Sequence, residues 1–361
     1  MSRREDTRQV RIGRVLVGGG APVAVQSMTT TDTRNPDATV AQIERLESLG
    51  CEIVRTAVPD QTAAAALREI KSRIRLPLVA DIHFDYRLAL AALESGVDKL
   101  RLNPGNIGAA DRVRVVAREA KARGVPIRVG ANVGSISKEM LRKYGEPCAD
   151  ALVESALDEI KILEDLDFRD IVVSVKGSDV EMALEAYVKI SQQISYPIHV
   201  GITESGTAWG GTVKSAVGLG AILSRGIGDT IRVSLAAPPE EEVKAGFEIL
   251  KALGLRERGP VLIACPSCGR ADVDIVRLAQ EVERRIAGYK VPIKVAVMGC
   301  AVNGPGEARM ADLGIAGGKG MGLIFRKGKV VASLPEHELL DGLMKEAEAV
   351  VQEKGAAAPK G

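Results

Sequence analysis

An eightfold repeat of strand and helix patterns is the feature that most constrains the fold of this chain. From residue 20 onward, short runs rich in β-branched residues alternate with amphipathic stretches whose apolar residues recur at helical spacing. Several helical stretches stop at a glycine just before the next strand, as at Gly50, Gly96 and Gly124, which is typical of a helix C-terminus. The predicted strands are 22–28, 52–58, 77–84, 98–104, 126–134, 170–178, 197–206 and 229–236.

Eight such units in about 240 residues indicate an α/β fold, a (β/α)8 TIM barrel. A doubly wound open sheet is the alternative, but the repeat is uninterrupted and no G-x-G-x-x-G turn follows a strand. The segment before the first strand predicts a short hairpin that closes the bottom of the barrel. We therefore expect a barrel domain with this hairpin over 1–258, a small α+β domain over 259–350 and a disordered tail over 351–361.

Composition excludes several classes of function. The 49 basic and 47 acidic side chains leave a net charge of +2, and aromatic residues make up 3%, so we expect no nucleic-acid partner. The N-terminus has no apolar signal region and no long apolar run occurs, so we expect no membrane partner and a cytoplasmic protein. In that compartment cysteines stay reduced and serve as ligands or nucleophiles.

Polar side chains collect at the C-terminal ends of the predicted strands, where TIM barrels carry their chemistry. Many stand at i and i+2 within one strand, so both members face the same side. Burying several cations without an anion is costly, and Asp81 and Glu204 are the acidic residues at these strand ends. A bound anion such as a diphosphate would balance them, because guanidinium groups suit phosphate oxygens. The candidates are Arg55, His83, Arg101, Arg128, Asn132, Lys176, Arg232 and Ser234.

Some of these residues have a plainer interpretation. Any one of the cations could pair with an acidic neighbour at the mouth, and His83 could be a structural histidine. Glu204 is either a salt-bridge partner for the cations or a proton donor near a reacting carbon. Trp209 is expected to pack at the start of a helix.

Three cysteines of the second domain form a second candidate site. Cys265 and Cys268 make a C-x-x-C pair in "CPSCGR", and Cys300 follows in "MGCAVNGPGEA". Structural zinc sites and 4Fe-4S clusters both want four ligands, so one ligand is missing. A zinc ribbon with a non-cysteine fourth ligand remains an alternative to a cluster. Cys51 is predicted to be a buried small residue, and Cys148 is not expected to be a ligand.

Together with "VQSMT" and "ADIHF" in the barrel, these cysteine motifs resemble the bacterial two-domain 4-hydroxy-3-methylbut-2-enyl diphosphate synthases of the non-mevalonate isoprenoid pathway. The likeness runs from about residue 7 to residue 350. It implies a 4Fe-4S cluster whose fourth ligand, beside Cys265, Cys268 and Cys300, is Glu307. It also implies reductive ring opening and dehydration of 2-C-methyl-D-erythritol 2,4-cyclodiphosphate to the linear allylic diphosphate.

The resemblance carries over to single residues. The family's diphosphate-binding pattern falls on Arg55, His83, Arg101, Arg128, Lys176, Arg232 and Ser234, with Asn132 beside them and Asn303 near the substrate. Its catalytic glutamates fall on Glu204, which assists protonation, and on the cluster ligand Glu307. Electrons would come from flavodoxin or ferredoxin, since no flavin or nicotinamide motif occurs. Because the link between the domains is short, we expect a head-to-tail homodimer in which each cluster domain covers the partner's barrel.

Two rival functions remain at this point. One is a non-redox, phosphosugar-binding barrel transferase, similar to dihydropteroate synthase, with a structural zinc domain. The other is an iron–sulfur sensor without enzymatic activity. Metal content separates the first rival from the redox enzyme, and turnover of the cyclic diphosphate separates the second.

Overall fold

The chain forms two compact units, Met1–Arg256 and Glu257–Gly361. The computed structural model describes residues 4–107, 110–268, 271, 273–300, 310–318 and 320–357. The boundary between the units falls two residues before the one expected from the sequence. Each unit has its own hydrophobic core and is described by itself.

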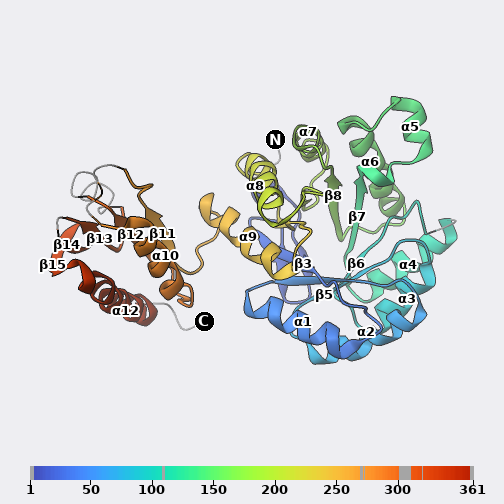
Figure 1. The fold of residues 1–361 in the computed structure, drawn as a ribbon. Helices are drawn as coiled ribbons and strands as arrows, with labels where there is room; N and C mark the ends of the chain where they lie inside the picture. Colours follow the sequence, from blue (N-terminus) through green and yellow to red (C-terminus); the bar gives the residue numbers. More distant parts are fainter. Residues whose placement is uncertain are drawn as a thin grey trace. The chain divides into compact units, whose positions relative to one another are not determined.

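The first unit is a barrel of eight parallel strands (Figure 1). The strands follow one another in the order β8-β7-β6-β5-β4-β3-β10-β9, and a bridge between Val173 and Ile198 joins the two ends of the sheet. The predicted TIM barrel is thereby confirmed, with strands shorter than expected. The strands are β3 (Ala24–Met28), β4 (Ile53–Ala57), β5 (Leu78–Asp81), β6 (Lys99–Arg101), β7 (Ile127–Asn132), β8 (Ile171–Lys176), β9 (His199–Val200) and β10 (Thr230–Ile231).

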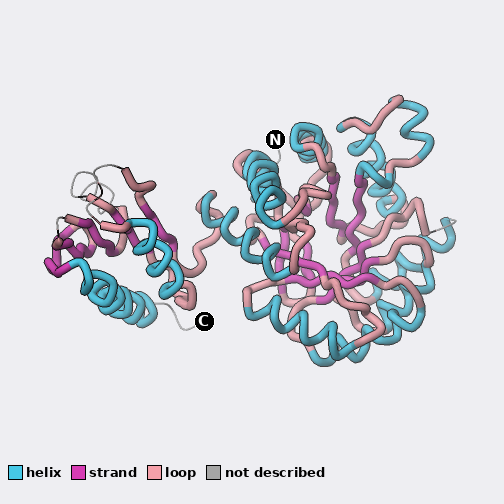
Figure 2. The backbone as a smooth tube through the Cα atoms, in the orientation of Figure 1, coloured by secondary structure: helices cyan, strands magenta, loops and turns pink. Residues whose placement is uncertain are grey.

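Helices surround this ring of strands (Figure 2). Several begin at a residue whose side chain accepts a backbone N–H of the first turn, as Asn35, Asp60 and Asp179 do. Trp209 on α8 is 82% exposed, so the expectation that it packs at the helix start is wrong. The helices are α1 (Pro36–Ser48), α2 (Gln61–Arg73), α3 (Tyr86–Glu94), α4 (Ala110–Ala122), α5 (Lys138–Tyr144), α6 (Ala149–Glu164), α7 (Val180–Ser191), α8 (Ala208–Leu223) and α9 (Pro239–Ala252), with 3-10 turns η1 (Arg4–Asp6) and η2 (Val133–Ser135).

A hairpin closes the bottom of the barrel, as the sequence indicated. Strands β1 (Val10–Ile12) and β2 (Val15–Val17) pair antiparallel. Ile12 and Val17 are fully buried against Ala24, Ile53 and Val79. Because Ala24 and Ile53 are the first residues of their strands, the hairpin seals the end opposite the C-terminal strand ends.

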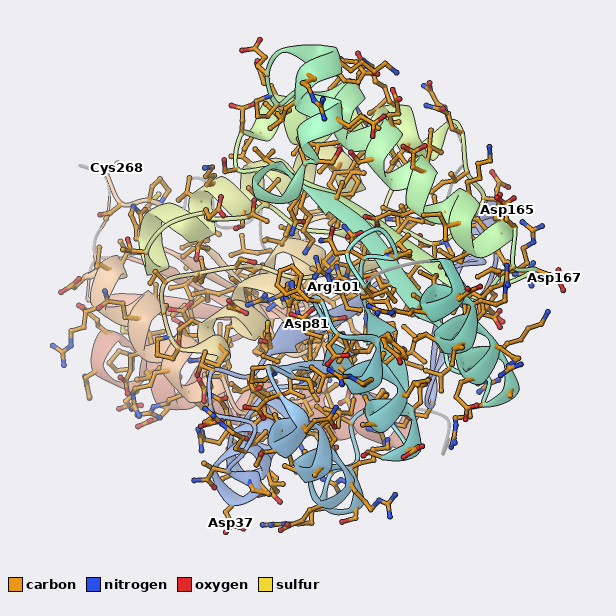
Figure 3. All side chains as sticks on the ribbon, turned by 90° about the vertical axis from the view of Figure 1, so that its right-hand side faces the viewer. Asp37, Asp81, Arg101, Asp165, Asp167 and Cys268 are labelled. Carbon is orange, nitrogen blue, oxygen red and sulfur yellow. The ribbon has the colours of Figure 1, made fainter. Side chains whose placement is uncertain are left out.

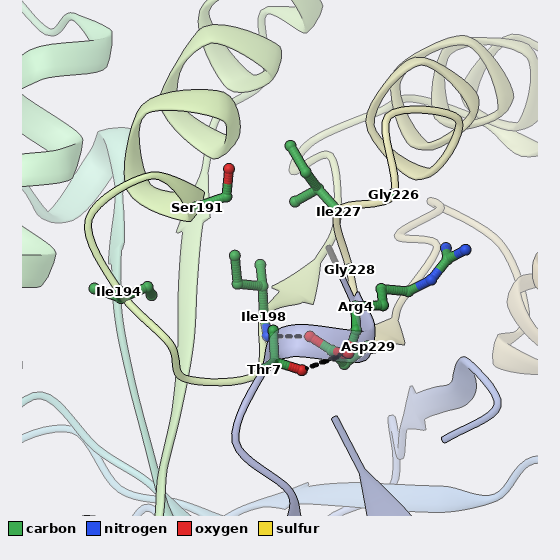
Figure 4. A pocket seen from close by; sticks show the side chains of 9 residues that line it. All are labelled: Arg4, Thr7, Ser191, Ile194, Ile198, Gly226, Ile227, Gly228 and Asp229. Atoms are coloured by element: carbon green, nitrogen blue, oxygen red, sulfur yellow. Dashed lines mark hydrogen bonds between the residues drawn. The ribbon is translucent and has the colours of Figure 1, made fainter. Parts of the chain in front are cut away.

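The N-terminal segment is hydrogen bonded to the same end of the barrel (Figure 4). Asp229, just before β10, accepts hydrogen bonds from the Ile198 backbone N–H at 2.7 Å and from the Thr7 hydroxyl at 3.1 Å. Burial raises the pKa of Asp229 to about 6, and these hydrogen bonds oppose the rise. The small pocket around it therefore belongs to the sealed bottom, away from the strand ends that carry chemistry.

The second unit is a mixed five-stranded sheet packed against two helices. Its strand order is β11-β12-β13-β14-β15, parallel for the first three strands and antiparallel from β13 to β15. Val282 of α10 and Leu343 of α12 share one core with Val297 and Ile315 of the sheet. The elements are β11 (Val261–Ala264), β12 (Lys294–Met298), β13 (Leu313–Gly317), β14 (Met321–Arg326), β15 (Lys329–Pro335), α10 (Ile275–Ile286), η3 (Glu336–Glu338) and α12 (Leu339–Ala357).

The C-terminal helix corrects one expectation. We predicted a disordered tail from residue 351, but α12 continues to Ala357. Val350 is buried and Val351 packs beside it on the core, and the Gln, Glu, Lys and Ala residues that follow are good helix formers. Residues 358–361 lie outside the described part of the chain. No helix in the described ranges combines the length and apolarity that a membrane span requires.

Candidate functional site

The structure brings five predicted cations together at the C-terminal end of the barrel. We call Arg55, Arg101, Arg128, Lys176 and Arg232 the cation cluster. The four arginines each lower the pKa of the Lys176 ammonium, on top of the lowering caused by its burial. Arg101, Arg128 and Lys176 are 7%, 2% and 5% exposed. Strand pairing explains the grouping, because Arg101 lies opposite both Asp81 and Arg128 in neighbouring strands (Figure 3 shows Asp81 and Arg101 side by side).

Asp81 is the central carboxylate among these cations. Its oxygens lie 3.8 Å from Arg55 Nε, 3.5 Å from Arg101 NH1 and 3.4 Å from His83 Nε2. Burial alone would raise the pKa of Asp81, but Arg55, His83 and Arg101 together hold it well below its usual range. Asp81 therefore stays ionised and fixes the orientation of two arginines. His83 Nδ1 also lies 3.3 Å from Arg101 NH1, which connects it to the cluster.

Glu242 on α9 is a second carboxylate of the site, and the sequence reasoning missed it. Its oxygens lie 3.2 and 3.3 Å from Arg232 NH2 and Nε, and it also accepts the Leu235 backbone N–H at 3.1 Å. The sequence pattern pointed to acidic residues at strand ends, whereas Glu242 reaches the mouth from a helix. A glutamate on the inward face of an amphipathic helix was the available signal.

The five cations of the cluster carry more positive charge than the carboxylates paired with them neutralise, and this excess favours an anionic ligand. Among the described residues, Asp81 and Glu242 are the carboxylates that form ion pairs with it. Arg55 and Arg232, which take part in these ion pairs, also direct N–H groups at a thioether: Met28 Sδ lies 2.8 Å from Arg55 Nη2 and 3.5 Å from Arg232 Nη1. Sulfur is a weak acceptor, so these donors remain available for phosphate oxygens.

The barrel interior below the cluster is also polar, which the sequence reasoning did not foresee. Lys99 and His199 are fully buried, and Lys99 Nζ donates to Gln26 Oε1 at 3.2 Å. His199 Nδ1 lies 2.6 Å from the Thr230 hydroxyl. Lys99 stands two residues before Arg101, so the i, i+2 rule could have placed it inside the barrel. Bulky apolar residues usually fill that layer.

The remaining predicted barrel residues lie at the mouth with fewer described contacts. Asn132 ends β7 opposite Lys176, and Ser234 is half-buried after β10. Glu204 is exposed after β9 in a left-handed backbone conformation, with φ +49°. No ion pair in the described part of the chain joins Glu204 to the cation cluster. A left-handed backbone conformation is strained for a residue such as Glu204, and strain of this kind is concentrated at functional sites.

Cys265 and Cys300 follow two parallel strands that pair with each other, β11 and β12. Cys265 directly follows β11, and its backbone N–H donates to Val297 O of β12 at 3.0 Å. The Gly299 N–H donates in turn to Cys265 Sγ at 3.4 Å, so the segment that leads into Cys300 lies beside this thiol. Cys268 is exposed three residues later, after a left-handed Ser267 with φ +62°.

The donor set suits a soft metal or an iron–sulfur cluster. Thiolates are its natural ligands, and an N–H donated to the Cys265 sulfur is the kind of hydrogen bond that tunes such centres. A Cβ at Gly299 would lie in a tight contact, 3.2 Å, with the Cβ of Ala271 and in ordinary contact, 3.5 Å, with the Cys265 sulfur. Within the described ranges no three metal-ligating side chains are grouped. The predicted Asn303 and Glu307 lie outside those ranges.

The other two cysteines belong to the barrel unit. Cys51 is 3% exposed and its thiol lies 3.2 Å from Ile53 O, which confirms that it is a buried small residue. Burial raises the pKa of Cys51 to about 12, so its free thiol stays protonated. Cys148 stands at the N-terminus of α6 in the barrel unit.

Comparison with known proteins gives consistent results along the chain. Residues 7–247 match the GcpE TIM-barrel domain, and residues 261–349 match the GcpE protein C-terminal domain. Relatives named 4-hydroxy-3-methylbut-2-en-1-yl diphosphate synthase (flavodoxin) include those of Anoxybacillus flavithermus and Geobacillus kaustophilus. Each is 60% identical over 97% of this chain, covering 96% and 94% of the relative.

Solved structures support the barrel fold alone. Dihydropteroate synthases of Yersinia pestis and Stenotrophomonas maltophilia align with TM-scores of 0.50 at 10% and 13% identity. Each covers 69% of this chain, with 100% and 97% of the other chain aligned. The rival function similar to dihydropteroate synthase therefore has no support beyond the shared barrel. Both family models and the relatives at 60% identity agree, and the chain belongs to the GcpE family.

Proposed function

We propose that this chain converts 2-C-methyl-D-erythritol 2,4-cyclodiphosphate into 4-hydroxy-3-methylbut-2-enyl diphosphate. The names of its relatives support this reaction. The observation that carries the proposal is the cation cluster, five buried or half-buried cations with two carboxylates in described ion pairs. A diphosphate supplies the missing negative charge and the planar sets of oxygens that guanidinium groups bind.

The reaction can be written with its balance. The C2–O bond to phosphate and the C3–OH bond break, a C2=C3 double bond forms, and the hydroxyl leaves as water. For a dianionic substrate, two electrons and one proton are taken up and the product is a trianion. A 4Fe-4S cluster held by Cys265, Cys268, Cys300 and Glu307 would supply the two electrons one at a time.

The barrel residues do the remaining work in this proposal. The cation cluster, with His83, Asn132 and Ser234, holds the diphosphate and stabilises the charge that develops on the departing phosphate oxygen, and Asn303 of the second domain would also bind the substrate. Asp81 and Glu242 keep three of the arginines in place. Glu204 donates the proton that turns the leaving hydroxyl into water.

The electron donor we propose is flavodoxin, with ferredoxin as the alternative. The relatives' names include flavodoxin. Electrons have to come from a separate carrier because the sequence has no motif for a flavin or a nicotinamide.

We also propose that two chains share their active sites as a head-to-tail homodimer. Arg256, which follows α9, donates to Val23 O at 2.8 Å and forms an ion pair with Glu52 at 2.8 Å. Both partners stand near the first residues of β3 and β4, so Arg256 is held at the sealed end of the barrel. Residues 257–260, the link to β11, span about 14 Å at most, which is short beside a barrel with loops. A two-fold pairing would let each cluster domain reach the partner's mouth.

Anaerobic turnover of the cyclic diphosphate tests the function. The purified protein, with its iron content measured, is mixed with the substrate and a strong chemical reductant, and the linear diphosphate is detected by mass spectrometry. We expect product that depends on both reductant and iron. A colourless protein that contains zinc and forms no product would refute the proposal.

A further inference from the structure

Lys99 lies inside the barrel, beneath the cation cluster. It is the first residue of β6 and is fully buried, at 0% exposure. In the strand pairing Lys99 lies opposite Val79, whereas Arg101 lies opposite Asp81. Lys99 is therefore two residues, about 7 Å, nearer the sealed bottom than the arginine that binds Asp81.

Among the described residues, no carboxylate forms an ion pair with Lys99. Its described side-chain partner is Gln26 Oε1 from β3, and the other amide atom, Gln26 Nε2, is buried without a hydrogen bond among the described residues. Cationic Arg55 on β4 and Arg128 on β7 both act on Lys99. From β9 it faces His199, whose own pKa is lowered by burial and by the neighbouring cations.

The neighbouring acidic groups pair with other cations, and Asp98, which directly precedes Lys99, pairs with Lys71. Asp81 on β5 faces Arg55, Arg101 and His83 toward the mouth. Lys176 on β8 adds a further positive charge, while Ser174 and Thr230 contribute hydroxyls. Arg232 on β10 is paired with Glu242.

Such surroundings favour the uncharged amine. Burial, Arg128 and Arg55 lower the pKa of Lys99 well below its ordinary value. Arginine cannot lose its proton in a protein, so changes in protonation fall on the lysines of this region. An anion bound to the guanidinium groups offsets part of the positive potential at Lys99 and so favours the ammonium form.

We propose that Lys99 is a neutral amine in the empty barrel and binds a proton when a diphosphate occupies the cation cluster above it. The inference rests on the proposed function, since it requires a diphosphate at this site. It makes Lys99 a positioning residue that acts through Gln26 and Arg128 without touching the substrate. The charge of the site thereby rises by one when the anionic ligand binds.

Titration calorimetry of the complete holoprotein tests this proposal. The cyclic diphosphate is added anaerobically without reductant, in two buffers with different enthalpies of ionisation, and the protons taken up per bound ligand are calculated. The Lys99→Met variant removes the amine but keeps its bulk. The Lys71→Met variant is the matched control, because Lys71 pairs with Asp98 away from the cluster.

We expect the wild type and Lys71→Met to take up close to one proton more per site than Lys99→Met. The affinity of the wild type for the cyclic diphosphate should then weaken by up to tenfold for each unit by which the pH rises, over the range in which the amine titrates. The Lys99→Met variant should lack this pH dependence. Gln26→Glu provides a second variant: a carboxylate beside Nζ keeps Lys99 charged in the empty protein, so the uptake should disappear there too.

The outcomes separate the inference from the proposed function. If all these proteins bind the cyclic diphosphate and take up equal numbers of protons, the role of Lys99 is refuted and the function stands. If the wild type with its cluster does not bind the compound, the proposed function fails and the inference fails with it. If Lys99→Met does not fold, unchanged uptake by Gln26→Glu still refutes the role of Lys99.

Discussion

Replacing Glu242 with glutamine should destabilise the empty barrel. The same replacement should destabilise the substrate-bound barrel far less. Glu242 is 4% exposed and holds Arg232 through both of its oxygens. Removing one partner of a fully buried ion pair costs about 3–5 kcal/mol. Arg232 keeps 17% exposure, and glutamine can still accept the Leu235 N–H, so we expect a loss of about 2 kcal/mol.

A bound diphosphate supplies the negative charge that the variant lacks. The loss in the presence of saturating cyclic diphosphate should therefore fall below about 1 kcal/mol. The assay is urea unfolding followed by far-UV circular dichroism, with and without the ligand. Glu241→Gln is the control, since Glu241 pairs with Lys244 on the surface and should change stability by less than about 0.5 kcal/mol. Equal losses in the two variants, or a loss that the ligand does not reduce, would contradict this account of the site.

Three further predictions concern the cluster, the pH dependence and the assembly. Serine at each proposed cysteine ligand should abolish the brown visible absorbance and the bound iron, whereas Cys51→Ser and Cys148→Ser should retain both. Burial raises the pKa of Glu159 from 4.5 to about 8, so the folded state favours the protonated carboxyl. The contribution of this protonated group to the free energy of unfolding is full below about pH 4.5 and is lost as pH rises through 8. Because glutamine still accepts the Gly130 N–H, Glu159→Gln should match the wild type near pH 5 and exceed it by about 1–3 kcal/mol near pH 9, measured by urea unfolding. Equal mixtures of Glu204→Gln and Cys300→Ser chains should regain roughly a quarter of wild-type turnover, and inactive mixed dimers would refute the shared site.

The barrel could be predicted because its sequence pattern repeats eight times and each repeat uses the same physical signals. Strand lengths were less predictable: β9 keeps two residues, His199 and Val200, of the ten expected over 197–206. Beyond residue 200 that chain leaves the ladder to form the loop that carries Glu204. A strand ends where the neighbouring strands no longer provide backbone hydrogen-bond partners, and the sequence of a single segment does not show where that happens.

The site was predictable where side chains belong to strand ends and less so elsewhere. Arg55, Arg101, Arg128, Lys176 and Arg232 follow from strand periodicity. Glu242 comes from a helix, and Lys99 occupies a layer where charge is normally excluded, so local rules did not select either one. Trp209 is exposed although apolar residues usually lie inside, since one residue's burial depends on packing that helical spacing does not specify.

The hairpin under the barrel has a consequence for the kinetics of turnover. With Ile12 and Val17 sealing one end, we expect ligands to enter and leave through the mouth. Product must depart before the next substrate arrives, so the linear diphosphate should inhibit competitively against the cyclic one. Because the product carries one more negative charge among the same cations, its departure is the step that we expect to limit the rate when the electron supply is ample.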